Sequence, residues 1–357
     1  MTAAPGAVRI EPGSGARDAG LVAHYGDPMR EQRQLDSEAG VVDRGNRGVL
    51  AVPGSDRLSW LHNLTTQHLT SLQPWQGTQT LVLSPHGHIE HHAMVTDDGE
   101  TTWLDTEPDV APELLKHLER MRFFSQVEPR DASDELTVLT LLGPRAGAAL
   151  EALGVSLGQP DVLSPPEPKF ATGSVPARPT AIYPAVALPD GGIARRVAAN
   201  QVDLLTPRSA VDSLAETLRE AGVPACGIWA YEALRVAART PRHGVDNDHR
   251  ALVHEAGWLA TSVHLEKGCY RGQETVARVH NLGRAPRRLV LLHLDGAVER
   301  APDPGVDVEL DGRRVGVLGS SARHFELGMI ALATVKRNVP DDARLTVGES
   351  AAAIDPG

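Results

Sequence analysis

The sequence predicts an α+β protein: two lobes of the ferredoxin-like, split β-α-β type followed by a C-terminal antiparallel β-barrel. Three observations lead to this fold class. A chain of 357 residues is long for a single core. Two segments that lie 89 residues apart open with the same strand–glycine–helix pattern. Helix signals disappear after Arg288, where short apolar runs alternate with turn residues.

The first lobe is predicted to span residues 19–134. The apolar run 49–53 ends at Gly54, and leucines then recur at helical spacing, which predicts a strand followed by a helix. Three further strands and a second helix are expected in this lobe, near residues 78–83, 87–96, 100–105 and 112–121.

The second lobe is predicted to span residues 135–285 and to open in the same way, with an apolar run that ends at Gly143 before a helical pattern. A strand near 192–205 and a helix near 209–222 continue it. Between them, residues 159–180 contain six prolines, which predicts a loop or flap.

The C-terminal domain is predicted to span residues 286–357. Five apolar runs are separated by Asp-Gly, Gly-Ser and Asn-Val-Pro punctuation, as in a small β-barrel. The runs are 289–294, 306–310, 315–318, 330–335 and 345–347.

Composition limits the classes of partner. The net charge of −11 and the pI near 5.7 argue against nucleic acid and anionic membranes as partners. Aromatic residues make up only 4% of the chain, so stacking platforms for bases are scarce. With two cysteines, and without a signal pattern or a run of about 20 apolar residues, we expect a cytoplasmic protein. Residues 1–18, rich in Gly and Pro, predict a flexible arm.

The most distinctive segment is Lys-Gly-Cys-Tyr-Arg-Gly-Gln-Glu at residues 267–274. In an extended conformation, Lys267, Cys269 and Arg271 would share one side, and Tyr270 would point away. Two cations beside the thiol would favour the thiolate, which is the form that acts as nucleophile or metal ligand. The alternative is that Cys269 is a small buried apolar residue, as isolated cysteines often are; Cys226, which has no charged neighbours in sequence, is expected to be structural.

A basic stretch follows this segment and predicts a site for an anionic small molecule. Its members are Arg278, His280, Arg284, Arg287 and Arg288. The alternative is a solvated turn. Four histidines at residues 86–92 could suggest a metal, but they have no local ligand motif and no Cys, and we predict no metal site there.

The octapeptide resembles the signature of the YgfZ family, folate-binding proteins that assist iron–sulfur cluster assembly or repair. Residues 24–350 also resemble the related aminomethyltransferase, or T-protein, of the glycine cleavage system. The matching stretches include His24-Tyr25-Gly26, Ala233-Leu234-Arg235 and His254-Glu255. The resemblance implies three domains arranged as a ring around a central pocket for tetrahydrofolate.

Two departures from the T-protein pattern concern function. Gly87-His88-Ile89-Glu90-His91 matches a Gly-x-Ile-Asp-Asp segment whose aspartate acts in aminomethyl transfer, so Glu90 stands in its place. Catalysis is sensitive to shifts of about 1 Å, and the extra methylene therefore puts transferase activity in doubt. Ala237 stands where these families commonly have the glutamate that holds the pterin, which would weaken folate binding.

These observations lead to a main hypothesis and two alternatives. The main hypothesis is a non-enzymatic or weakly catalytic folate-binding accessory protein for iron–sulfur assembly or client proteins, in which Cys269 contacts a cluster transiently. The alternative is a tetrahydrofolate-dependent aminomethyltransferase or demethylase-like enzyme that uses Glu90. A cysteine-nucleophile enzyme with His254 or His264 as base is the third reading.

Nine residues are assigned to the site. Cys269, Lys267 and Glu90 are the predicted catalytic group, with Lys267 and Arg271 tuning the thiol. Tyr270 and Gln273 are expected to position the loop, and Arg278 to orient ligand or loop. The residues assigned to cofactor binding are Tyr270, Arg271, Gln273, Arg278, Arg235 and His254.

Overall fold

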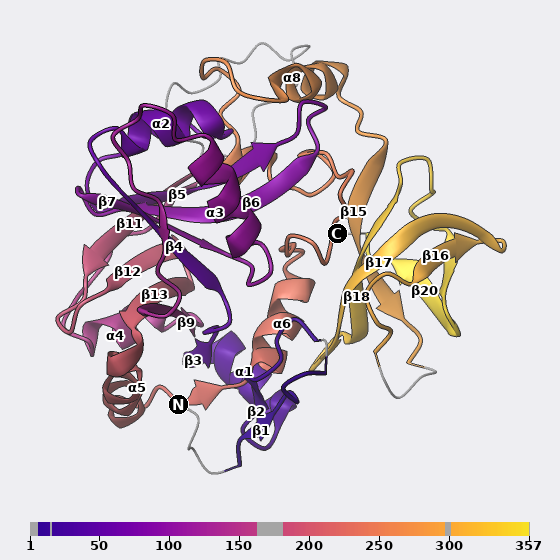
Figure 1. Cartoon of the computed structure of the whole chain (residues 1–357). Coiled ribbons are helices and arrows are strands. Elements are labelled where there is room, and N and C mark those ends of the chain that lie inside the picture. Colours follow the sequence, from indigo (N-terminus) through magenta and orange to yellow (C-terminus); the bar gives the residue numbers. More distant parts are fainter. Residues whose placement is uncertain (1–5, 15, 163–180, 297–300, 357) are drawn as a thin grey trace.

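The computed structural model describes residues 6–14, 16–162, 181–296 and 301–356, and it confirms the predicted α+β class (Figure 1). Two lobes share one large sheet, and a separate barrel lies beside them. The first lobe consists of β4 (Gly48–Pro53), α2 (Arg57–Leu64), β5 (Gln76–Leu83), β6 (Ile89–Asp97), β7 (Thr101–Thr106), α3 (Ala111–Arg120) and β8 (Arg130–Asp131).

The second lobe repeats this order of elements. It consists of β9 (Leu136–Leu142), α4 (Ala146–Glu151), β10 (Asp161–Val162), β11 (Ala181–Ala187), β12 (Ile193–Ala198), β13 (Gln201–Pro207), the short helix η1 (Arg208–Ala210), α5 (Val211–Glu220) and β14 (Ala225–Cys226). The single strand expected at 192–205 is a hairpin, β12 and β13, because the chain turns at residues 199–200. Most of the expected flap, residues 163–180, lies outside the described residues.

One sheet of twelve strands runs through both lobes, with β5 paired to β11 where they meet. On either side the strand order repeats, as β5-β6-β7-β4 in the first lobe and β11-β12-β13-β9 in the second. Gly54 and Gly143 occupy equivalent positions after the first strand of each lobe, and both have φ of +128°. A Cβ on either would approach a backbone oxygen within 2.4 Å, so the two helices can begin there only after glycine.

The C-terminal domain is a closed barrel with strand order β15-β18-β17-β16-β19-β20. Its strands are β15 (Arg287–Leu294), β16 (Asp307–Leu310), β17 (Arg313–His324), β18 (Gly328–Lys336), β19 (Arg344–Val347) and β20 (Ser350–Ile354). Five of the six were expected. The sixth, β20, is rich in alanine and carries little strand signal of its own, and its pairing with β15 closes the barrel.

The described part of the expected flexible arm, residues 6–14 and 16–18, is ordered by contacts with the rest of the chain. β1 (Val8–Arg9) pairs with β2 (Val22–His24), and Arg17 and Asp18 form ion pairs far along the chain. Glycine and proline content alone could not reveal these long-range contacts. α1 (Pro28–Ser37) follows, with Asp27 accepting the Met29 and Arg30 amides, and then β3 (Gly40–Asp43), which joins the second lobe's half of the sheet.

After the strands of the second lobe, the chain packs on the other two domains. α6 (Ile228–Ala237) packs on the barrel through Ala233 and Val236. Residues 251–276, which include α7 (Leu259–Ser262) and the start of α8 (Gln273–Leu282), pack on Leu81, Leu83 and Ile89 of the first lobe. This differs from the expectation that the octapeptide segment belongs with the second lobe. Boundaries at 134, 135 and 285 stay a prediction.

A buried ion cluster lies where the lobes meet. Arg195 of β12 is fully buried and pairs with Asp105 of β7 at 2.9 Å and Asp203 of β13 at 3.2 Å. Burial alone would raise the pKa of Asp105, but the guanidiniums of Arg195 and Arg47 outweigh it and hold that pKa below its usual range. The cluster therefore joins the two halves of the sheet by charge as well as by strand pairing.

Replacing Arg195 with alanine is expected to lower the free energy of unfolding by about 3–5 kcal/mol, because two buried carboxylates each lose one of their cations. Arg145→Ala is the matched control, since Arg145 pairs with Glu38 at the surface and exposed pairs contribute about 0–1 kcal/mol. Urea unfolding of both variants measures the difference. Equal losses would contradict a role for Arg195 in joining the lobes.

Candidate functional site

The octapeptide segment is a turn that leads into α8, not an extended strand. Lys267 is buried, and its Nζ donates hydrogen bonds to the backbone oxygens of His62 and Thr65 at the end of α2. The same ammonium lies 5.2 Å from the centre of the Tyr270 ring. Burial lowers the pKa of Lys267 to about 7.

The two buried side chains of this turn leave the thiol outside. Tyr270 is buried in the cluster that includes Leu81 and Val263, and burial raises the pKa of its hydroxyl. Cys269 is exposed. The expectation that Lys267 and Arg271 flank Cys269 is therefore wrong for Lys267, because the turn directs its ammonium to α2 and Tyr270. Cys226 is buried, and burial raises its pKa to about 12, in keeping with a structural residue.

Two glycines allow the octapeptide to pack closely against the turn before β6. A Cβ on Gly272 would lie 2.8 Å from Gly87 Cα, and a Cβ on Gly87 would lie 2.6 Å from Thr275 Cβ. Both glycines have positive φ, +82° and +79°, which side chains rarely adopt. The contact brings together the two segments that the sequence singled out, 87–91 and 267–274.

Glu90 and Arg271 meet across this contact. The Arg271 guanidinium lies 3.3 and 3.4 Å from the two carboxylate oxygens, and both side chains are partly exposed, at 42% and 35%. The backbone oxygen of Glu90 lies 3.0 Å from His243 Nε2. Burial lowers the pKa of His117, on α3, while the charge of Glu90 opposes that shift. Glu90 therefore has a fixed backbone and a carboxylate that solvent can reach.

The remaining predicted residues lie apart from this pair or fix the loop. Gln273 Nε2 lies 3.4 Å from the Lys267 oxygen, and Arg278 is exposed on α8. His254 is adjacent to His280, with ring centres 6.1 Å apart, and burial lowers its pKa to about 4. Arg235 is buried and pairs with Glu232 and Asp246, a structural arrangement.

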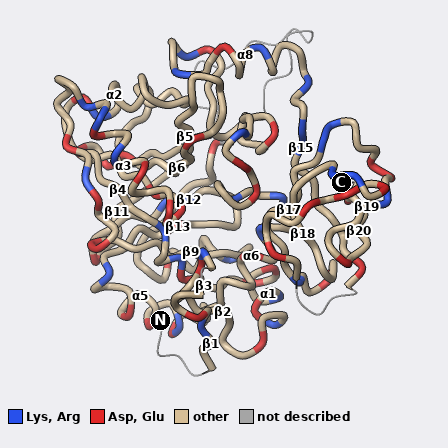
Figure 2. Tube along the Cα trace, turned by 45° about the vertical axis from the view of Figure 1, so that its right-hand side comes forward, with Lys and Arg blue, Asp and Glu red and all other residues tan. Residues whose placement is uncertain are grey.

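Two members of the basic stretch are neutralised by carboxylates. Arg287 pairs with Asp248 and Glu255, and Arg288 pairs with Asp341. These contacts form at long range in the sequence, so the run of cations did not reveal them. In the view of Figure 2 basic and acidic positions are mixed along the chain instead of forming one basic face.

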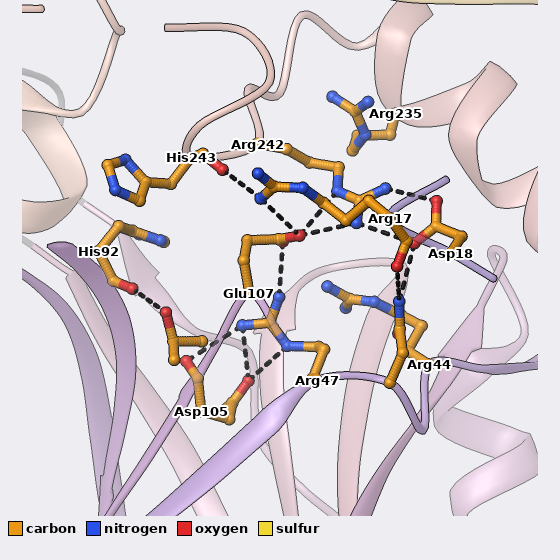
Figure 3. A network of polar contacts seen from close by, with 12 residues as sticks. Arg17, Asp18, Arg44, Arg47, His92, Asp105, Glu107, Arg235, Arg242 and His243 are labelled. Carbon is orange, nitrogen blue, oxygen red and sulfur yellow. Dashed lines mark hydrogen bonds and ion pairs between the residues drawn. The ribbon is translucent and has the colours of Figure 1, made fainter. Parts of the chain in front are cut away.

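A network of buried ion pairs occupies the space between the lobes and α6 (Figure 3). Arg47 pairs with Asp105 and Glu107 at 3.0 Å each, and Arg242 lies 2.7 Å from Glu107. Burial opposes the charged form of Glu107, but Arg242 and Arg47 outweigh it and lower its pKa well below the usual range. Asp18, from the N-terminal segment, also pairs with Arg242.

Of the residues labelled in Figure 3, Arg235 is among the nine predicted site residues. No motif singled out Arg47, Asp105, Glu107, Arg242 or Asp18. One compositional signal could have pointed to them: the chain has 31 Arg against 4 Lys. The planar guanidinium suits buried, bidentate pairing with carboxylates better than an ammonium does.

Aromatic rings border the network. His92 stacks on Trp258, with ring centres 4.5 Å apart and planes 6° apart, and His243 lies 6.2 Å from the same indole. Burial lowers the pKa of His92 to about 3. Nδ1 of His243 is buried without a hydrogen-bond partner in the described structure. Neutral aromatic rings, two of them in the buried residues Trp258 and His243, thus lie beside Glu90.

Ala237 has no polar side-chain group to offer a ligand, and it packs against the barrel together with Leu289. The nearby carboxylate of Glu232 is already engaged by Arg235 and Arg242, and these partners overcome burial to lower its pKa to about 2. Within the described ranges, no group of three or more metal-ligating side chains is arranged to hold an ion. None of the described helices is long and apolar enough to span a membrane.

Gly272→Ala is expected to destabilise the protein by about 1–2 kcal/mol, because alanine is strained at positive φ and would push the octapeptide away from Gly87. Gly268→Ala is the matched control, since a Cβ there meets nothing within 4 Å. Thermal unfolding and hydrogen exchange of residues 267–276 measure the effect. Equal behaviour of the two variants would contradict the packing role of Gly272.

Lys267 should give the stability a pH dependence of known sign. Its pKa is about 7 in the folded chain and about 10.4 in the unfolded chain, so the unfolded chain binds the proton more tightly. The free energy of unfolding should therefore rise between pH 7 and 10, relative to Lys267→Met, by up to about 1.4 kcal/mol per pH unit. Denaturant unfolding at several pH values, with exposed Lys336→Met as control, tests this; identical slopes for wild type and Lys267→Met would contradict it.

Comparison with known proteins places this geometry in a family. Residues 26–162 match the GCVT N-terminal domain. An aminomethyltransferase of Synechococcus sp. strain RCC307 is 30% identical over 330 residues, which cover 87% of this chain and 83% of that protein. A chloroplastic protein of Arabidopsis thaliana, described provisionally as a transferase, is 28% identical over 349 residues, covering 96% of this chain and 76% of the relative.

The fold has a solved counterpart. The crystal structure of the glycine cleavage system aminomethyltransferase T from Bartonella henselae superposes with a TM-score of 0.75 at 18% identity, covering 97% of this chain and 92% of that one. This likeness confirms the multi-domain fold predicted from the sequence. Together with the identity over most of the chain, it leads to one conclusion: this chain belongs to the aminomethyltransferase family.

Proposed function

We propose that this chain binds a reduced folate and acts in one-carbon transfer of the aminomethyl type. Family membership supports the reaction class. The observation that carries the proposal is the placement of Glu90, whose backbone is fixed by His243 while its carboxylate stays partly exposed. A carboxylate in that position can stabilise a developing cation or accept a proton.

The residues present fit a reduced folate in part. A pteridine needs flat neighbours and hydrogen-bonding groups. Groups of both kinds, the His92–Trp258 stack and the buried, unpartnered Nδ1 of His243, lie next to Glu90. Ala237 and the engaged Glu232 offer no free carboxylate for the pterin edge. Within this proposal Arg271 and Glu90 meet the ligand, Lys267, Tyr270 and Gln273 fix the loop, and Arg278 and His254 border it.

A second candidate function is the accessory role in iron–sulfur cluster assembly or repair. One observation favours it: Cys269 is a free thiol, exposed on a turn that buried Lys267 and Tyr270 anchor. The pairing of Glu90 with Arg271 also leaves that carboxylate less available as a base. One cysteine does not hold a cluster alone, so the cluster would be cargo shared with a client protein.

The two functions predict opposite mutant phenotypes. In the transferase, purified protein with tetrahydrofolate and an aminomethyl donor forms methylenetetrahydrofolate and releases ammonia. Glu90→Gln lowers kcat about a hundredfold or more, as for loss of a positioned acid–base group. Cys269→Ala leaves that rate unchanged. Absence of turnover, with tetrahydrofolate still bound in a titration, would contradict the transferase proposal.

Complementation tests the accessory role. In a strain that lacks this protein and has lost iron–sulfur enzyme activities, wild type and Glu90→Gln should restore those activities, whereas Cys269→Ala should not. Cys226→Ala is the matched control for loss of a thiol. Full rescue by Cys269→Ala would contradict the role of the exposed thiol.

A further inference from the structure

The N-terminal segment reaches the centre of the molecule through two side chains. Arg17 and Asp18 lie among the ion pairs of Figure 3, although most of residues 6–14 lie at the surface. Arg17 donates to the His243 oxygen at 2.7 Å and to Asp109 at 2.8 Å, and it lies 3.6 Å from Glu107. The segment therefore covers the side of the network that also borders His243.

Asp18 contacts Arg242 in the geometry of a bound carboxylate. Its two oxygens accept from Nη1 and Nη2 of Arg242 at 2.8 and 2.9 Å, a bidentate arrangement. Asn46 Nδ2 donates to Oδ1 at 2.9 Å. A planar fork of donors with an added amide is a general receptor for a carboxylate, and Asp18 is the carboxylate that fills it in this structure.

The segment that carries Asp18 is held mainly by polar contacts. None of the described residues from 6 to 20 is fully buried, and β1 pairs with β2 over only two residues. Arg242 has two further carboxylate partners, Glu107 and Glu232, which stay in place if the segment moves. An exchange of Asp18 for another carboxylate would keep the bidentate pair of Arg242.

We propose that Asp18 occupies a carboxylate-binding site at Arg242 and Asn46, and that a carboxylate of the protein's ligand displaces it together with Arg17. The proposal rests on the proposed function, since a reduced folate bears carboxylates on its glutamate tail. A free amino acid is the second source of the same group. In the unliganded protein Asp18 competes with the ligand, so the apparent affinity is reduced by the fraction of molecules in which the site is open.

The test compares Asp18→Asn with Glu11→Gln, which removes the same charge from an exposed position in the same segment. Calorimetric titrations use three probes: tetrahydrofolate, tetrahydropterin, which has no carboxylate, and glycine. Asp18→Asn should bind tetrahydrofolate about tenfold more tightly than wild type if Asp18 fills the site in nine molecules of ten. Glu11→Gln should match wild type, and tetrahydropterin should not distinguish the three proteins.

The sign of the change separates competition from a structural role. If Asp18 only stabilised the fold, Asp18→Asn would bind both tetrahydrofolate and glycine equally or more weakly than wild type, and that result would overturn the proposal. Tighter binding of glycine, with tetrahydrofolate unchanged, assigns the site to a free amino acid.

A measurement on the wild-type chain does not depend on how the variant folds. The Leu21 amide donates a hydrogen bond to the backbone oxygen of Asp18, and the Gly20 amide donates one to the backbone oxygen of Ile10. Hydrogen exchange at both amides should accelerate when the carboxylate-bearing ligand is added, and unchanged or slower exchange with ligand bound would contradict displacement.

The two proposals can fail separately. If tetrahydrofolate and tetrahydropterin bind none of the proteins, the folate function fails, and the glycine titration of Asp18→Asn still decides the site. If tetrahydrofolate binds wild type and Asp18→Asn equally, and glycine also shows no gain, the folate function stands and displacement of Asp18 fails.

Discussion

The burial of arginine beside carboxylate is the constraint on which the arrangement of this molecule depends. A desolvated guanidinium is tolerated only where carboxylates meet it. Arg195 joins the two halves of the sheet through ion pairs with Asp105 and Asp203. Arg242 forms ion pairs with Asp18, Glu107 and Glu232. The lobes, the N-terminal segment and α6 therefore meet where charge must be balanced.

The parts of the fold that local pattern governs could be predicted from the sequence. The equivalent Gly54 and Gly143 indicated the repeat, and apolar runs predicted five barrel strands. Both signals are local, because turn chemistry and periodicity act over a few residues. The ion network, the pairing of β1 and the packing of residues 251–276 on the first lobe depend on contacts across the whole chain. No short window contains Arg17 and His243 together.

The candidate site likewise combines features that local sequence could predict with features that depend on the fold. The octapeptide and Glu90 were identified as chemically distinctive, and Gly87 and Gly272 bring them into contact. The direction of each side chain could not be derived, because it follows from a turn: Lys267 points to α2 and Tyr270 into the core, while Cys269 stays outside. The octapeptide turn and β6 thus offer two functional groups, a thiol in solvent and a carboxylate paired with Arg271, and these two groups underlie the two proposed functions.

The central claim is that a reduced folate is bound beside Glu90, and a crystal structure of the protein with tetrahydrofolate tests it most directly. The account predicts the pteridine next to Glu90 and His243, with the Arg271 guanidinium moved from the carboxylate toward the ligand. A structure in which tetrahydrofolate lies away from these residues, with the Glu90–Arg271 pair intact, would contradict it.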